Sequence, residues 1–155
     1  MMTKIDPKDV QRLRSESGAG VMDCKRALEE TGGDYAKALA LIKERGIQSV
    51  AKKSERSANE GVIASYVHAN NRVGALIELA SETDFVARGE EFQKLAKEIA
   101  MQVVAMEPAT VDELLEQPYI RDSSKTIKDL VTDVAAMTKE NVHVRRIQRF
   151  ALGGS

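Results

Sequence analysis

The sequence predicts an α+β protein, with a bundle of three short helices followed by a small antiparallel sheet packed with helices. In the first part of the chain, apolar residues recur at helical spacing between glycine-rich breaks. Near residue 60 the pattern changes to that of strands, and helical patterns then return before a last strand-like segment. Strands at both ends of this second part, with helices between them, indicate an antiparallel sheet covered by helices.

The composition fits a small protein with a core of its own. The chain has 155 residues, 43% hydrophobic and 30% charged, and one cysteine, Cys24, which cannot form an internal disulfide. Its 23 basic and 24 acidic residues leave a net charge of −1, too little to attract nucleic acid or an anionic membrane. The first residues lack a signal-peptide core, and no apolar run approaches the ~20 residues that cross a bilayer. We expect a soluble, cytoplasmic protein with no direct nucleic-acid or membrane partner.

Residues 1–47 are expected to form the three-helix bundle. Asp6 followed by Pro7 is typical of an N-cap and a first helical position. Glycines at 18 and 20 separate this helix from a second one, which ends at the glycines 32 and 33. Asp34 can cap a third helix, which we expect Gly46 to stop. A bundle this small favours a docking surface over a pocket.

Residues 48–60 are expected to connect this bundle to a second domain, residues 61–155. The connecting stretch carries small and charged residues without an apolar stripe, which is typical of a linker or an exposed helix. Residues 62–67 and 73–79 are rich in strand formers, and two asparagines at 70 and 71 provide turn chemistry between them. The second domain should therefore begin with a hairpin.

The rest of the second domain reads as helices and one strand. Residues 83–106 repeat apolar residues with the spacing of one buried helix face, and Pro108 ends that pattern. A short helix is expected over 110–117, and Asp122 or Ser123 can cap another. The segment 142–150 alternates like a strand until Arg145 and Arg146, which predict a bulge or an edge position.

No part of the sequence has the pattern of a catalytic or metal site. The glycines at 18 and 20 could hint at anion binding, but Asp23 occupies the position of a third glycine and no strand precedes them. The two histidines lie far apart without companions at ligand spacing, and Cys24 has no evident histidine partner. We therefore expect no enzymatic activity, no metal and no cofactor.

The segment around Phe85 admits two interpretations. Phe85 precedes Phe92 by seven residues, close to the phase of the buried helix face, so spacing alone favours a core residue. Gly89 followed by two glutamates, however, indicates that one helix stops and another starts. A kink there would expose Phe85 beside Asp84, and an exposed aromatic anchor is suited to entering a cleft of another protein.

Five stretches of the sequence resemble the elongation factor Ts family of bacteria, over about residues 6 to 153. They read SGAGVMDCKRALEETGGDYAKAL, EGVIASYVHANNRVGALIEL, ETDFVARGEEFQKLAKEIAMQVV, LLEQPYIRD and VHVRRIQRF. The resemblance implies a guanine-nucleotide exchange factor for elongation factor Tu, the GTPase that delivers aminoacyl-tRNA. It also implies that the first bundle has a ubiquitin-associated-like fold and docks on the GTPase, and that residues 61–155 correspond to a core domain of dimerisation type.

The resemblance also implies which residues contact the partner. Asp84 and Phe85 match the pair that intrudes on the magnesium and phosphate surroundings of the GTPase, and Thr83, Val86 and Ala87 complete the motif. Lys25 matches a second contact, reached through the exposed start of the second helix, which comprises Val21, Met22 and Asp23. Without this motif, Lys25 would read as an ordinary solvated lysine.

The sequence departs from the family in three places. Ala80 and Ser81 stand where Asn and Cys are common, and Ser17 stands where threonine is usual. Additional helical sequence that members carry after the Pro108 region is absent, and the core is not duplicated. The short, unduplicated form resembles members that work as dimers, so a homodimer is a hypothesis here. An alternative reading is a non-catalytic adaptor in which Phe85 lies in the core.

Overall fold

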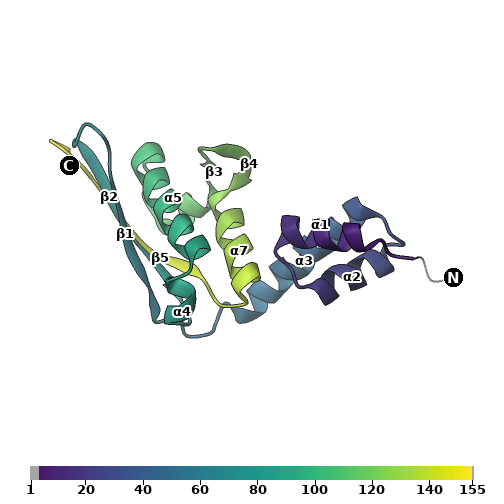
Figure 1. Ribbon diagram of the computed structural model, residues 1–155. Coiled ribbons are helices and arrows are strands. Elements are labelled where there is room, and N and C mark those ends of the chain that lie inside the picture. Colours follow the sequence, from purple (N-terminus) through teal and green to yellow (C-terminus); the bar gives the residue numbers. More distant parts are fainter. Residues whose placement is uncertain (1–3, 155) are drawn as a thin grey trace. The chain divides into compact units, whose positions relative to one another are not determined.

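The computed structural model describes residues 4–154, and the chain divides into two compact units between Lys52 and Lys53 (Figure 1). Residues 1–3 and 155, which the two predicted domains include, lie outside the described residues. The first unit is helical and the second combines helices with antiparallel strands. The predicted α+β class is confirmed.

Three helices make the first unit: α1 (Pro7–Ser17), α2 (Val21–Glu30) and α3 (Tyr35–Lys53). The Asp6 side chain accepts a hydrogen bond from the Lys8 backbone N–H at 2.9 Å, so it caps α1 as predicted. Gly18 adopts the left-handed conformation at the end of α1, with φ of 72°. The glycine pair at 18 and 20 is thus a turn between helices.

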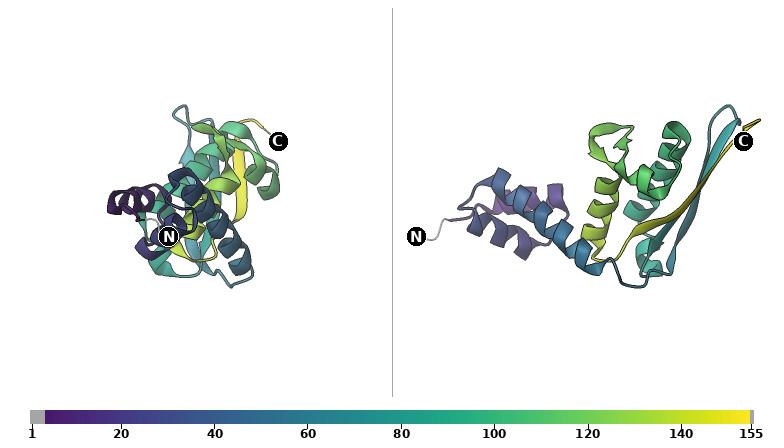
Figure 2. Two further views of the ribbon diagram at one scale, coloured as in Figure 1. Left: turned by 90° about the vertical axis from the view of Figure 1, so that its right-hand side faces the viewer. Right: turned by 180° about the vertical axis from the view of Figure 1, so that it is seen from behind.

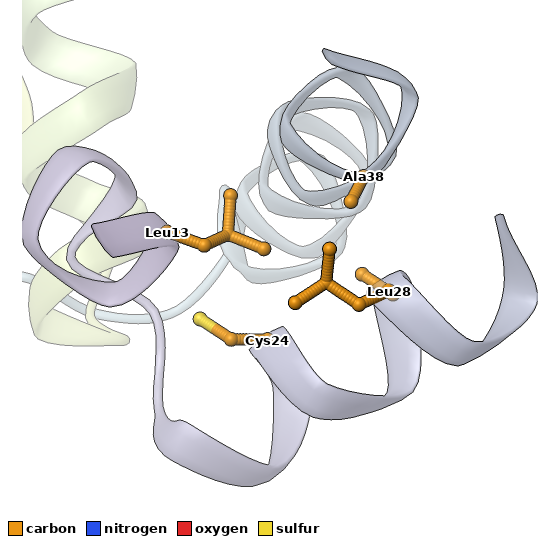
Figure 3. Packing of buried hydrophobic residues seen from close by; sticks show 5 residues of the cluster. Leu13, Cys24, Leu28 and Ala38 are labelled. Atoms are coloured by element: carbon orange, nitrogen blue, oxygen red, sulfur yellow. The ribbon is translucent and has the colours of Figure 1, made fainter. Parts of the chain in front are cut away.

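Small and branched apolar side chains fill the core of the first unit (Figure 3). Leu13 of α1, Cys24 and Leu28 of α2 and Ala38 of α3 point toward one another and are fully buried. The interpretation of Cys24 as a small buried hydrophobe is confirmed. Burial raises the pKa of its thiol, which favours the uncharged form.

The third helix does not stop at Gly46 as expected, but continues to Lys53. A glycine inside a helix costs only about 1 kcal/mol relative to alanine, so it can be passed where the flanking residues favour the helix. The first six residues of the expected linker 48–60 are therefore helical. Residues 54–59 form a non-helical connection before the first strand.

A three-stranded antiparallel sheet forms the centre of the second unit, in the order β1-β2-β5. The strands are β1 (Glu60–Val67), β2 (Val73–Ser81) and β5 (His143–Ala151). The predicted hairpin joins β1 and β2, with Asn71 in the left-handed conformation at φ of 58°. The predicted bulge lies in β5, because Arg146 pairs with Glu78 and Val144 with Leu79, which leaves Arg145 unpaired in the register.

Four helices and a second, two-stranded hairpin complete this unit. The helices are α4 (Asp84–Ala87), α5 (Glu90–Met106), α6 (Val111–Glu116) and α7 (Ile127–Thr138), and the hairpin strands are β3 (Pro118–Tyr119) and β4 (Asp122–Thr126). This hairpin was not predicted. The Asp122 carboxylate accepts a hydrogen bond from the Ser124 backbone N–H within this hairpin. The expected cap of α7 at Asp122 or Ser123 is therefore wrong, because Thr126 and Asp129 form the capping box. No helix within residues 4–154 combines the length and apolarity needed to cross a membrane.

Within the second unit, helices cover one face of the sheet (Figure 1, and from behind in Figure 2). Phe92 and Ile99 of α5 are buried, as are Ile77 and Leu79 of β2, and α5 packs against β1 and β2. The opposite face carries exposed apolar side chains from all three strands, namely Ile63, Val67, Leu76 and Phe150. The sheet therefore has one face that is covered by helices and one uncovered face.

Candidate partner-binding site

The structure places Thr83 to Ala87 in a short tip at the end of the sheet where β2 finishes. Thr83 is extended and its hydroxyl oxygen accepts a hydrogen bond from the Val86 backbone N–H at 3.3 Å. The single turn of α4 follows, and the Arg88 N–H closes it by donating to the Asp84 carbonyl at 3.0 Å. Thr83 is thus the N-cap of α4, while the Ser81 side chain is buried and its hydroxyl donates to the Thr83 carbonyl.

Phe85 projects from this tip with 87% of its surface exposed. Ala87, two residues later, is buried against the rest of the unit, and Val86 is half-buried. The interpretation that puts Phe85 in the core, on which the adaptor reading depended, is therefore wrong. An isolated exposed phenylalanine leaves a large apolar surface in water that contact with another molecule would remove.

Gly89 separates the tip from α5. It is the N-cap of α5, and Glu90 and Glu91 occupy the first turn, as the stop-and-restart pattern predicted. The Gly89 N–H donates to the Val86 carbonyl at 3.0 Å, and a Cβ on Gly89 would lie only 3.1 Å from that oxygen. The close approach favours glycine at this break in the helix.

The Asp84 carboxylate forms an ion pair with Arg88 one turn later on the same helix. Both side chains are largely exposed, with 54% and 77% of their surface accessible. A carboxylate in the first turn of a helix also lies at the positive end of the helix dipole. Asp84 thus stands beside Phe85 as a charged group that a partner can reach.

A carboxylate from elsewhere in the unit also holds the tip. Glu140, at the turn between α7 and β5, accepts hydrogen bonds from the backbone N–H and the hydroxyl of Thr83, at 3.0 and 2.7 Å. Sequence reasoning missed this residue. It lies 57 positions after Thr83, and no local pattern signals such a contact.

The other predicted contact residues lie on the first unit, at the start of α2. Val21 and Met22 are exposed, Met22 at 59%, and Asp23 and Lys25 are exposed beside them. Cys24 points the other way into the core. The predicted residues therefore lie in two groups, one on each unit; each group exposes apolar and charged side chains, while Ala87 is buried.

Within residues 4–154, no three His, Cys, Asp or Glu side chains lie close enough to hold a metal ion. A strongly shifted group, Tyr119, lies far along the chain from the tip: desolvation and its bond to Glu98 raise its pKa to about 12. The tip exposes the Phe85 ring and the Asp84 carboxylate to solvent.

Several known proteins similar to this chain are described as elongation factor Ts. A family model described as Elongation factor TS matches residues 82–155. Elongation factor Ts of Oleidesulfovibrio alaskensis is 39% identical over 98% of this chain and 100% of its own length. The proteins of the same description from Anaeromyxobacter dehalogenans strain 2CP-1 and Prochlorococcus marinus strain SARG are 39% and 42% identical over 98% of this chain, and 90% and 91% of their lengths are covered. The first alignment spans 197 positions, more than the 155 residues of this chain, so that relative has residues without a counterpart here.

Proposed function

Because this chain belongs to the elongation factor Ts family, we propose that it promotes release of GDP from elongation factor Tu. Membership makes it a translation elongation factor; exchange on this GTPase is the specific activity proposed. The observation that carries the proposal is Phe85, an aromatic side chain exposed at the end of a short capped helix.

The proposed mechanism is a competition between two ligands of the GTPase. An exchange factor binds the nucleotide-free form more tightly than the nucleotide-bound form, and linkage requires it to weaken nucleotide binding by the same factor. GTPases hold the nucleotide through a phosphate loop and a magnesium ion. The factor needs only to displace those elements, so no covalent bond is made or broken on this chain.

Phe85 is the proposed wedge and Asp84 its charged neighbour. Burial of a phenylalanine side chain contributes about 1.5–3 kcal/mol of free energy. Because Phe85 is almost fully exposed in the free protein, nearly all of this free energy is available for contact with a partner. Inserted between helices of the partner, Phe85 would hold apart the segments that place the phosphate and magnesium ligands. The Asp84 carboxylate would add a negative charge close to the phosphate groups, which disfavours bound nucleotide.

The exposed start of α2 is the proposed docking surface. Val21 and Met22 supply apolar contact, and Asp23 and Lys25 supply charges that fix orientation. In this proposal the first unit acts as a ubiquitin-associated-like docking domain for the GTPase. Lys25→Ala should weaken the complex with nucleotide-free elongation factor Tu, and an unchanged affinity would remove Lys25 from the site.

Incoming GTP completes the proposed cycle. GTP favours a conformation of the GTPase to which the factor binds weakly, so the same differential affinity that releases GDP then releases the factor. The factor emerges unchanged and can act on another molecule.

The decisive experiment measures release of labelled GDP from purified elongation factor Tu with and without the protein. We expect wild-type protein to accelerate release and Phe85→Ala to lose about thirtyfold of that acceleration, as for a hot-spot residue worth about 2 kcal/mol. Met137→Ala, which removes another exposed apolar side chain, is the control and should behave like wild type. Unaltered stimulation by Phe85→Ala would contradict the wedge.

We further propose that two copies pair through the uncovered face of the sheet. This face presents Ile63, Val67, Leu76 and Phe150, and a twofold axis would place each copy's apolar side chains against those of the other. Phe150→Lys would place a charge within that contact and should yield a monomer in sedimentation. Wild-type protein that sediments only as a monomer at working concentration would contradict the dimer.

A further inference from the structure

We propose that Glu140 and Asn141 are positioning residues for the tip: their hydrogen bonds fix the direction in which Asp84 and Phe85 project. This inference rests on the proposed exchange function for its consequence, but its geometry stands on the contacts alone. The two residues form the turn between α7 and β5, where α7 ends in a left-handed residue, Lys139, with φ of 61°.

The Glu140 carboxylate gathers three donors from the segment that leads into α4. One oxygen accepts from the backbone N–H groups of Glu82 and Thr83, at 3.1 and 3.0 Å. The other accepts from the Thr83 hydroxyl at 2.7 Å. Hydrogen bonds to an ionised carboxylate are roughly twice as strong as neutral ones. Glu140 therefore fixes both the backbone and the side chain of the cap residue.

Glu82 and Asn141 return the contact in the opposite direction. The Glu82 carboxylate accepts from the Asn141 backbone N–H at 2.6 Å and lies 3.8 Å from the Arg56 guanidinium. Each segment thus supplies a carboxylate to backbone donors of the other segment. A reciprocal pair of this kind resists both rotation and separation of the two segments.

The Asn141 side chain anchors the arrangement to a third segment. Its amide donates to the carbonyl oxygens of Ser54 and Arg56, at 3.2 and 2.7 Å, and the residue is buried. These carbonyls belong to the stretch between α3 and β1. The turn at 140–141 therefore joins the tip to that stretch, which lies more than 80 residues before Asn141 in the sequence.

The tip needs such external support because little else holds it. The single turn of α4 is too short to be stable alone. Of its four residues only Ala87 is buried, so apolar packing gives one small anchor at its C-terminal end. The N-terminal end, which carries Asp84 and Phe85, is fixed by the Thr83 cap, by the Ser81 hydroxyl that donates to the Thr83 carbonyl, and by Glu140. Removing Glu140 should loosen the direction of the wedge without emptying the core.

The test combines amide exchange with the GDP-release assay on the full chain. In Glu140→Ala we expect hydrogen exchange at the Glu82 and Thr83 amides to speed up at least about tenfold, since both lose their acceptor. Exchange at the buried amides of α5 should stay unchanged. Stimulated GDP release should fall about tenfold, while the affinity for elongation factor Tu, which the α2 surface provides in this proposal, should stay within about twofold. A general loss of structure would lower both.

Two further variants sharpen the reading. Glu140→Gln keeps one acceptor oxygen, so it should recover part of both the amide protection and the release rate. Glu116→Ala removes an exposed carboxylate from α6 and serves as the matched control, with wild-type behaviour expected in both assays. If Glu140→Ala unfolds the protein as a whole, Glu140→Gln is judged by the same two measurements.

Failure of the two proposals can be told apart. If wild-type protein does not accelerate GDP release, the exchange function fails, while the amide measurement still tests the contacts of Glu140. If the amides of Glu82 and Thr83 stay protected in the Glu140 variants, the positioning role is overturned. The same holds if those amides lose protection and the release rate of an active wild type is fully retained.

Discussion

Phe85 and Phe92 lie seven residues apart, yet one is 87% exposed and the other 1% exposed. Seven residues are two helical turns, so an unbroken helix would put both rings on one face. Gly89 ends that continuity, because α4 closes before it and α5 begins after it. Helical periodicity thus predicts a shared face only within one continuous helix.

The tip, Thr83 to Ala87, and the rest of the second unit, here called the body, are also held by different forces. Phe92 is enclosed with Leu95 and Ile99 of α5, so the body of the unit rests on apolar packing. The tip rests on hydrogen bonds, in which the Thr83 hydroxyl accepts from the Val86 N–H and donates to the Glu140 carboxylate. Changes in the body should therefore cost stability, while changes in the tip should cost function.

The largest effect is expected from Phe92→Ala. Truncation of a buried phenylalanine removes about 3–5 kcal/mol of unfolding free energy. Phe85→Ala should change that free energy by no more than about 0.5 kcal/mol, as is usual for exposed positions. Urea unfolding followed by circular dichroism measures both values. Similar losses in the two variants would contradict the contrast.

Two threonine caps give a narrower comparison. Thr83→Ala and Thr126→Ala each remove a side-chain acceptor at a helix start, and each should cost about 1 kcal/mol. Only Thr83→Ala should also slow stimulated GDP release, because Thr83 carries the tip. If Thr126→Ala slows release equally at temperatures where both variants are folded, the tip is not the part that matters.

Tyr119 provides a pH-dependent test within the body. Its hydroxyl donates to Glu98 at 2.6 Å, and desolvation with this bond raises its pKa to about 12. A pKa raised above the unfolded value of about 10 means that Tyr119 stabilises the fold below pH 10. This contribution disappears as the pH rises from about 10 to about 12.

Tyr119→Phe should therefore cost about 1 kcal/mol at pH 7 and less above pH 10. Urea unfolding at a series of pH values measures the difference between variant and wild type. Stimulated GDP release at pH 7 should remain at the wild-type rate. A difference that grows above pH 10 would contradict the assigned bond.

A small effect on stability, like that of Phe85→Ala, is expected from Arg88→Ala. Exposed ion pairs contribute about 0–1 kcal/mol, and both partners of the Asp84–Arg88 pair are more than half exposed. We expect a change in unfolding free energy below about 0.5 kcal/mol, measured as for Phe92→Ala. A loss above 1 kcal/mol would show that this ion pair is a structural part of the tip.

Much of the fold follows from local patterns. The first hairpin, the buried face of α5 and the bulge near Arg145 were predicted, since alternation, periodicity and turn residues act over a few positions. The continuation of α3 past Gly46 and the hairpin at 118–126 were not predicted. In both places a local signal was misleading: Gly46 does not stop α3, and Asp122 and Ser123 lie in a strand and do not cap a helix.

Only part of the candidate site could be predicted from the sequence. Spacing left the environment of Phe85 open, and the Gly89 signal together with the family resemblance favoured exposure. The contacts of Glu140 and Asn141 were beyond sequence reasoning, because they join segments 57 to 87 residues apart through backbone groups that have no residue signature. The functional roles of Thr83 to Ala87 and of Val21, Met22, Asp23 and Lys25 stay predictions.

The unpaired Arg145 has a consequence for the far side of the sheet. Val144 and Ile147 lie opposite Leu79 and Ile77, so these two residues face the helices although three positions separate them. If Arg145 took a regular place in the register, strict alternation from Val144 would turn Phe150 toward the helices and Ile147 away from them. The bulge at Arg145 thus determines which side chains of β5 the uncovered face presents.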